Sequence, residues 1–266
     1  MNNVHEHNRR AWDSLVRNNH AFTEPVRAEQ LREPLAATDS LGWLDGGVAG
    51  KHVLCLAAGG GKYSVLFAEA GAVVTVVDIS PVTLALDRQV AAERGLVVRT
   101  IEASMDDLGV LAPASFDIVA QPVSTCYVPD VLAVYREVAR VTAPGGLYIS
   151  QHKQPASLQA EPRGSGGGYA LLEPYYRTGP LPDVAGSRHR EPGTLEFLHR
   201  WEQLIGGLCR AGFVIEDLTE PCHANEHSAP GEFGHRSRYV APYVRIKARR
   251  LADGHGAVRE AKIVTD

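Results

Sequence analysis

Five short apolar runs alternate with helical segments between residues 52 and 151, and this alternation constrains the fold more than any other feature of the chain. The runs are His52–Ala57, Val73–Val77, Val97–Glu102, Phe116–Ala120 and Leu147–Gln151. Continuous apolar runs of this length are typical of strands that are buried on both faces of a parallel sheet. Strands that alternate with helices form such a sheet through right-handed crossovers. The sequence therefore predicts an α/β fold with helices on both faces of the sheet.

The segments outside this alternation are less regular. Before it, we expect helical pieces, including a second short helix over Val26–Leu31 that Pro34 ends. After it, Thr194–Ala211 is predicted to be a helix, Phe213–Leu218 a strand, and the region near Tyr243–Ala248 a last strand. A chain of 266 residues suits one large α/β domain.

Charge and hydropathy disfavour two kinds of partner. The net charge is −4 with neutral histidines, whereas nucleic-acid binding needs clustered Lys and Arg. The basic stretch Arg245–Arg250 is expected to be a solvated strand end. No run approaches the ~20 apolar residues that span a bilayer, and the polar N-terminal residues do not resemble a signal peptide. We therefore expect a cytoplasmic protein that binds neither nucleic acid nor membrane.

The cysteines and histidines do not predict a metal site. Cys55, Cys126, Cys209 and Cys222 form no CxxC pair, and the histidines at positions 223, 227 and 235 lack the spacing of zinc ligands. Unpaired cysteines fit a reducing compartment. The sequence thus predicts no resident metal.

The glycines that follow the first strand indicate a ligand site. A glycine-rich turn between a strand and a helix lets backbone N–H groups approach a ligand closely. A Walker phosphate loop is excluded because Gly61-Lys62 is followed by Tyr63, where Ser or Thr is needed. A nicotinamide fingerprint fits imperfectly, since Ser64 stands where Gly or Ala is required.

The stretch Val53–Gly61 (VLCLAAGGG) resembles the first motif of the Rossmann-like, class I S-adenosylmethionine-dependent methyltransferases. That motif usually reads apolar-apolar-acidic-apolar-Gly-x-Gly-x-Gly. Two positions depart from it, because Cys55 replaces the acidic residue and Ala57 replaces the first glycine. The resemblance implies a seven-stranded sheet, mostly parallel with an antiparallel last strand. It also implies another partner, near Ala57, for the methionine amino group of the cofactor.

Downstream residues extend the resemblance over 50–151 and 195–250. In the family, an acidic residue at the end of the second strand accepts hydrogen bonds from the two ribose hydroxyls, and Asp78 stands there with Ile79 beside it. By the same resemblance, Met105 flanks the adenine ring and Ser104 or Asp106 meets its amine. The resemblance places Gln121 and Pro122 beside the sulfonium. The set of residues implied to bind S-adenosyl-L-methionine is Ala57, Gly59, Gly61, Asp78, Ile79, Ser104, Met105, Asp106, Gln121 and Pro122.

The candidate catalytic residues are His152, His199 and Tyr127. Methyl transfer mainly needs a nucleophile positioned on the methyl axis, and a hydroxyl or ammonium acceptor also needs a base. His152 stands at the exit of the fifth strand, where α/β sheets place ligands, and histidine titrates near neutral pH. The residues expected to shape the acceptor pocket are Trp12, Tyr169, Glu173, Tyr175 and Tyr176.

Together these features predict a methyltransferase that modifies an oxygen or nitrogen of a small molecule, such as a specialised metabolite. The expected parts are a helical cap (1–46), a cofactor-binding core (47–152), a substrate-side insertion (153–193), and a final helix with strands six and seven (194–250). The alternatives are an enzyme that binds the same cofactor but catalyses a cyclisation, a non-enzymatic scaffold, and an NAD-dependent dehydrogenase. The sequence leaves the oligomeric state open and is compatible with a homodimer.

Overall fold

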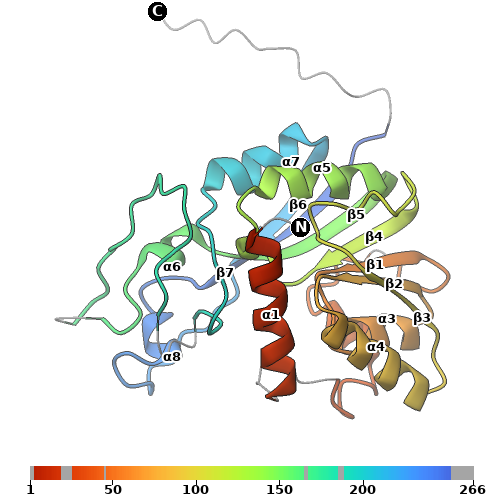
Figure 1. Cartoon of the computed structure of the whole chain (residues 1–266), viewed down its shortest axis with the longest axis horizontal. Helices are drawn as coiled ribbons and strands as arrows, with labels where there is room; N and C mark the ends of the chain where they lie inside the picture. Colours follow the sequence, from red (N-terminus) through yellow and green to blue (C-terminus); the bar gives the residue numbers. More distant parts are fainter. Residues whose placement is uncertain (1–2, 19–25, 45, 165–166, 185–188, 253–266) are drawn as a thin grey trace, which may run out of the picture.

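A computed structural model describes residues 3–18, 26–44, 46–164, 167–184 and 189–252 of the chain. Its centre is a seven-stranded sheet in the order β3-β2-β1-β4-β5-β7-β6 (Figure 1). Strand β7 pairs antiparallel with both β5 and β6, and the other pairings are parallel. The strands are β1 (His52–Leu56), β2 (Val73–Asp78), β3 (Val98–Glu102), β4 (Phe116–Gln121), β5 (Thr142–Lys153), β6 (Phe213–Thr219) and β7 (Tyr243–Arg250). The predicted fold class is confirmed.

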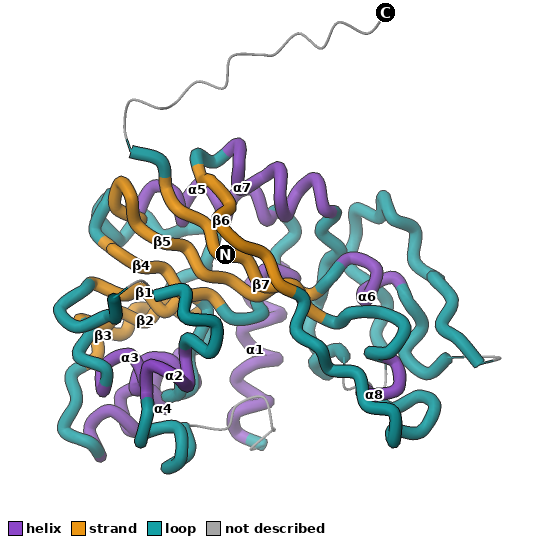
Figure 2. Tube along the Cα trace, turned by 180° about the vertical axis from the view of Figure 1, so that it is seen from behind, coloured by secondary structure: helices purple, strands orange, loops and turns teal. Residues whose placement is uncertain are grey.

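Alternate residues of each central strand enter different cores, as the pleat of a strand requires. Leu54 and Leu56 of β1 pack on the face that is covered by α5 (Val131–Val141) and α7 (Gly207–Arg210). Val53 and Cys55 pack on the opposite face, against α3 (Tyr63–Glu69) and α4 (Pro81–Glu93). Figure 2 shows these helices in layers on either side of the sheet.

The helices after β2 and β4 begin at side-chain caps. Ser80 Oγ accepts a hydrogen bond from the Thr83 N–H at 3.1 Å, and Pro81 occupies the first position of α4, as the sequence predicts. Asp130 caps α5 in the same way, since its carboxylate accepts from the Leu132 N–H. These caps fix where the chain leaves the carboxyl edge of the sheet.

Four short or peripheral helices surround this edge. Helix α1 (Asn3–Arg17) lies across it, and α2 (Pro34–Thr38) packs beside α3. Helices α6 (Pro155–Gln159) and α8 (Phe233–Arg236) belong to a lobe beside the end of β7, away from α3 and α4 in both views (Figures 1 and 2). Among the described residues, no helix is long and apolar enough to cross a membrane.

One predicted helix is wrong, and another, predicted over Thr194–Ala211, begins later than expected. Residues 26–33 form turns, and the helix starts only at Pro34, because proline suits the first turn of a helix. Residues 194–200 have no regular secondary structure, and the helix starts at Trp201 and includes a π-helical turn, Glu202–Gly206. In this irregular part, the Phe197 N–H donates to the Cys126 carbonyl at 2.7 Å. Tertiary hydrogen bonds of this kind take the backbone groups that a helix would use.

Candidate active site

The turn after β1 adopts the conformation that its glycines allow. Gly60 and Gly61 have φ angles of 116° and 73°, and Ala57 has a φ of 46°. A positive φ is uncommon for a residue with a Cβ atom, which accounts for the usual glycine at the position of Ala57. The Ala57 N–H donates to the Val77 carbonyl at 2.7 Å, which fixes the turn to β2.

Glycine is required at position 59 for a different reason, because the turn lies very close to the side chains of Asp78 and Thr83. A Cβ atom at this position would lie 2.6 Å from Thr83 Oγ1 and 3.0 Å from Asp78 Oδ2. The Gly59 N–H also donates to Asp78 Oδ2 at 3.0 Å. The glycine thus lets the turn approach the end of β2.

Substituting Gly59→Ala is expected to lower the free energy of unfolding by about 1–3 kcal/mol, because the added methyl group overpacks this contact. Binding of S-adenosylhomocysteine should weaken in parallel. Thermal unfolding and calorimetric titration would measure the two effects. Gly179→Ala is the matched control, because a Cβ atom there meets nothing within 4 Å. Equal behaviour of the two variants would contradict the argument.

Asp87 of α4 holds the rest of the turn. Its carboxylate accepts the Gly60 N–H at 2.8 Å and the Gly61 N–H at 3.0 Å, and the Ser64 hydroxyl donates to it as well. Burial raises the pKa of Asp87 to about 6, against the opposing effect of these donors. Cys55, at the family's acidic position, is buried on the same face. A carboxylate from α4 therefore anchors the loop in this chain.

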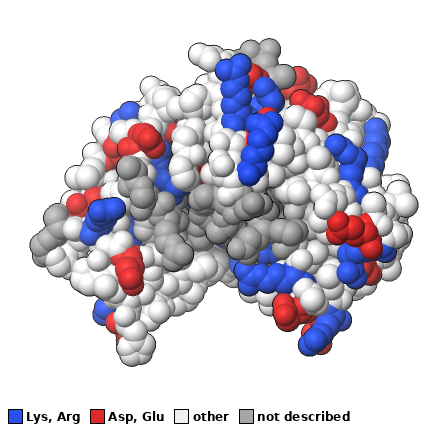
Figure 3. All heavy atoms as spheres, turned by 60° about the horizontal axis from the view of Figure 1, so that its bottom comes forward, with Lys and Arg blue, Asp and Glu red and all other residues white. Residues whose placement is uncertain are grey.

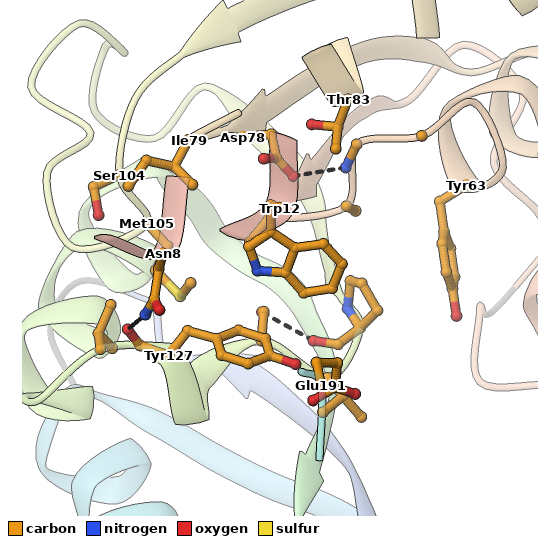
Figure 4. A pocket seen from close by; sticks show the side chains of 18 of the residues that line it. Asn8, Trp12, Tyr63, Asp78, Ile79, Thr83, Ser104, Met105, Tyr127 and Glu191 are labelled. Carbon is orange, nitrogen blue, oxygen red and sulfur yellow. Dashed lines mark hydrogen bonds between the residues drawn. The ribbon is translucent and has the colours of Figure 1, made fainter. Parts of the chain in front are cut away.

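A cavity of about 320 Å³ opens at the carboxyl ends of β1, β2 and β4 (Figure 4). From the sheet side, it is lined by Ala57, Ala58, Gly59, Gly60, Asp78, Ile79, Thr83, Ala103, Ser104, Met105 and Pro122. From the other side, it is lined by Trp12, Tyr127, Gln151, Glu191 and Tyr243, among others. Most residues predicted to bind the cofactor thus come together in one place.

Asp78 presents its carboxylate to this cavity from the end of β2. Oδ1 accepts the Ser80 N–H at 2.9 Å, and Oδ2 accepts the Gly59 N–H. Burial raises the pKa of Asp78, and hydrogen bonds from Ser80, Gly59, Thr83 and Ile79 oppose this effect. The carboxylate lines the cavity, and its two acceptor oxygens suit the hydroxyls of a vicinal diol.

Three of the predicted cofactor residues lie behind the wall of the cavity. The Gly61 N–H is bonded to Asp87. Asp106 pairs with His5 Nε2 at 3.1 Å and accepts a hydrogen bond from the Ser104 hydroxyl, so Ser104 faces the cavity and Asp106 supports it. Gln121 is buried, where its amide accepts from the Tyr148 hydroxyl at 2.6 Å and donates to Ser124 Oγ at 2.8 Å.

Helix α1 covers the cavity and connects its two sides. Asn8 Nδ2 donates to the carbonyls of Tyr127 and Leu195, and the Leu195 N–H donates back to Asn8 Oδ1. Asp13 accepts a hydrogen bond from the Ser80 hydroxyl at 2.6 Å. Trp12 lies between Asp78 and Tyr127 in Figure 4, with its ring edge-on to Tyr127 at 5.4 Å between centroids. The helical cap therefore covers the site and brings Trp12 to the cavity lining.

Neither predicted catalytic histidine lines the cavity. His152 is 1% exposed, with Nδ1 2.8 Å from Thr125 Oγ1 and Nε2 2.8 Å from Ser150 Oγ. Burial lowers its pKa to about 3, so the ring is neutral. His199 is also buried, with Nε2 2.9 Å from the Thr125 carbonyl oxygen. The structure thus gives both rings packing roles, and only Tyr127 of the three catalytic candidates reaches the cavity.

The four acceptor candidates of the insertion also lie away from the cavity. The Tyr169 hydroxyl bonds His235 Nδ1 at 2.8 Å, and Glu173 pairs with Arg177 at 2.9 Å. Tyr176 is 75% exposed, and its ring makes a T-shaped contact with that of Tyr175. Of these aromatic side chains, Tyr169 packs against α8 through His235, and Tyr176 is exposed to solvent. The far end of the insertion supplies the cavity instead, through Glu191.

Glu191, Tyr243 and Asn8 are site residues that sequence reasoning missed. No motif marks Glu191, which follows a long irregular segment. A buried ion pair with Lys153, at 2.5 Å between Nζ and Oε2, brings it to the site. Tyr243 begins the antiparallel β7, beside the end of β5. Within the described residues, no group of three or more His, Cys, Asp or Glu side chains could hold a metal ion.

Residues 54–150 match the family model of a methyltransferase domain. The chain is 32% identical over 234 residues to the uncharacterized methyltransferase YbaJ of Bacillus subtilis, which spans 83% of this chain and 91% of that protein. The chain belongs to the methyltransferase family. The predicted enzyme class is thereby confirmed, with S-adenosyl-L-methionine as the cofactor of this methyltransferase.

Solved structures share the fold of the methyltransferase at low sequence identity. An S-adenosylmethionine-dependent methyltransferase from Mesorhizobium loti superposes with a TM-score of 0.65 at 22% identity, covering 83% of this chain and all of that one. Geranyl diphosphate C-methyltransferase from Streptomyces coelicolor, solved with S-adenosyl-L-homocysteine, gives 0.64 at 17% identity, covering 94% and 99%. Both matches extend over most of the methyltransferase.

Proposed function

We propose that this methyltransferase modifies an oxygen or nitrogen atom of a small-molecule acceptor. The observation that carries this proposal is one cavity with two chemically different sides. The side at the ends of β1 and β2 has the glycine turn and Asp78, and the other side has Tyr127 and Glu191. A donor site and an acceptor site that share one enclosed space are what a direct transfer requires.

The residues present fit S-adenosyl-L-methionine. The turn leaves no room for a side chain at Gly59, and Asp78 brings a carboxylate, with its two acceptor oxygens, to the cavity lining. Ser104, Met105 and Ile79 supply one polar and two apolar side chains on the adjoining wall, as an adenine ring requires. When bound, the cofactor would supply a methyl group on a sulfonium, and the thioether that remains after the transfer is a good leaving group. The protein therefore has to bind and orient the two reactants and to exclude water from the site.

The size and surroundings of the cavity support a small acceptor. Its volume of about 320 Å³ lies at the lower end of the range for small-molecule pockets. Helix α1 closes it through Asn8 and Asp13. On the face that Figure 3 shows, basic side chains are interspersed with acidic ones among the described residues, which does not favour a polyanionic partner.

The variant Asp78→Ala is expected to weaken binding of S-adenosylhomocysteine by about 1.5–3 kcal/mol, or roughly tenfold to a hundredfold, because hydrogen bonds to a charged group are lost. Calorimetric titration would measure the change. Asp107→Ala, on an exposed carboxylate of the neighbouring loop, serves as the control and should bind normally. Unchanged affinity in the Asp78 variant would contradict the ribose assignment.

The function itself is tested by titrating S-adenosylmethionine, S-adenosylhomocysteine and NAD, followed by mass spectrometry of the incubated cofactor. We expect both sulfur ligands to bind, NAD to fail, and S-adenosylmethionine to stay intact until an oxygen or nitrogen acceptor is supplied. Release of methylthioadenosine without an acceptor would contradict the proposal and favour a cyclisation of the cofactor's own aminobutyl chain.

A further inference from the structure

A buried cluster of charges lies behind Glu191, which lines the cavity. Lys153 Nζ, at the end of β5, lies 2.5 Å from Glu191 Oε2 and 2.9 Å from Glu196 Oε2. The side chains of all three residues are at most 8% exposed. Burying charges is costly unless they are paired, so the lysine fixes the position of the segment that carries both glutamates.

The two glutamates differ in what they face. Glu196 Oε1 lies 3.3 Å from Arg190 Nε and accepts the Glu191 N–H, so both of its oxygens have protein partners. Glu191 lines the cavity, whereas Glu196 does not. In Figure 4 the hydroxyl of Tyr127 points toward Glu191, across the cavity from Asp78. Glu196 thus completes the ion pairs behind the cavity, whereas Glu191, which is held by Lys153 and the Tyr127 side chain, is the carboxylate that borders the cavity.

The charge state of this wall follows from its neighbours. Burial alone would raise the pKa of Glu191, but the ammonium of Lys153 holds this pKa below its usual range. Burial and the negative charge of Glu191 raise the pKa of Tyr127 well above its ordinary value, so the phenol is neutral. The member of this charge-paired cluster that borders the cavity is therefore a carboxylate, which accepts hydrogen bonds from donor groups and has none to donate to an anion.

We propose that Glu191 recognises the nucleophilic group of the acceptor, and that it selects an amine or hydroxyl over a carboxylate. This inference rests on the proposed function, because it concerns the acceptor side of the same cavity. It adds a specificity-determining residue and a class of substrate, namely molecules that bring a donor N–H or O–H group to the methyl group.

The first test compares matched probes on the wild-type protein saturated with S-adenosylhomocysteine. Benzylamine, benzyl alcohol and benzoate share a phenyl ring and differ in the charge and donor character of one group. By chemical-shift titration, we expect benzylamine to bind about tenfold more tightly than benzoate or better, with benzyl alcohol between them. Equal or tighter binding of benzoate, or no binding of benzylamine, would overturn the proposal.

The second test assigns the preference to one side chain. Glu191→Gln keeps the size of the side chain and leaves Lys153 paired with Glu196, and it should remove the preference for benzylamine while S-adenosylhomocysteine still binds. Glu196→Gln is the matched control, since it touches the same lysine outside the cavity, and it should keep the preference. Persistence of the preference in Glu191→Gln would refute the assignment. Failure of the wild-type protein to bind S-adenosylhomocysteine would instead refute the proposed function.

Discussion

Replacing Asp87 with alanine is expected to lower the free energy of unfolding by about 2–5 kcal/mol and to weaken cofactor binding with it. Three buried donors converge on this carboxylate, from Gly60, Gly61 and Ser64. Each buried donor that loses its partner costs about 1–3 kcal/mol, while relief from burying a charge offsets part of the total. Urea unfolding and titration with S-adenosylhomocysteine would measure both effects.

Two further variants make this prediction specific. Arg88→Ala, at the next position of α4, removes an exposed side chain with one hydrogen bond to Thr100 and should change stability little. Asp87→Asn keeps the size of the side chain but cannot ionise, so it is the reference for the dependence on pH. An alanine variant as stable as the wild type would show that the loop does not depend on Asp87.

The dependence on pH provides an independent check. The pKa of Asp87 is raised by folding from 3.8 to about 6, so between these values the native state binds a proton that the unfolded state lacks. Stability from this group is fully present below pH 3.8 and is lost as the pH rises through 6. The stability of the wild type relative to Asp87→Asn should therefore fall by roughly 1 kcal/mol between pH 5 and pH 7. A constant difference would contradict the raised pKa.

The fold was predictable wherever a local pattern determines structure. The apolar run Val73–Val77 became β2, and Ser80 caps the helix that follows it. The pattern misled at residues 194–200, where helical spacing of apolar side chains is present but the chain has no regular secondary structure. Periodicity cannot detect partners such as Asn8 and Cys126, which are remote in sequence and take the backbone groups of this segment.

The residues of the site likewise divide into those that a local motif predicts and those that it does not. Gly59, Asp78 and Met105 belong to motifs at the ends of strands, and topology brings those ends to one cavity. Asp87 and Glu191 belong to no motif, because their positions depend on a helix face and on a buried ion pair. His152 follows the rule that strand ends carry function, yet its ring points into the core beside Tyr135. One strand residue further, the side chain of Lys153 contacts Glu191, which lines the site.

Lys153→Met is expected to lower the free energy of unfolding by about 3–5 kcal/mol at neutral pH, because it leaves two buried carboxylates without their shared cation. Glu191 loses its paired ammonium, and Glu196 keeps only Arg190. Urea unfolding would measure the loss. Arg136→Met is the control, since its ion pair with Asp130 has both side chains more than half exposed and should contribute at most about 1 kcal/mol.

Acidification should reduce the deficit of the Lys153→Met variant. In the wild type the ammonium lowers the pKa of Glu191, so the stability from this group is present at neutral pH and is lost as the pH falls through the lowered value. Without the ammonium, burial raises the pKa of both glutamates in the folded state, and the variant regains stability as the pH falls through those raised values. Adding Glu191→Gln to Lys153→Met should restore part of the loss at neutral pH by removing one unpaired charge. A deficit that neither acid nor the added substitution reduces would mean that Lys153 acts through packing, and that its charge does not hold Glu191 at the acceptor site.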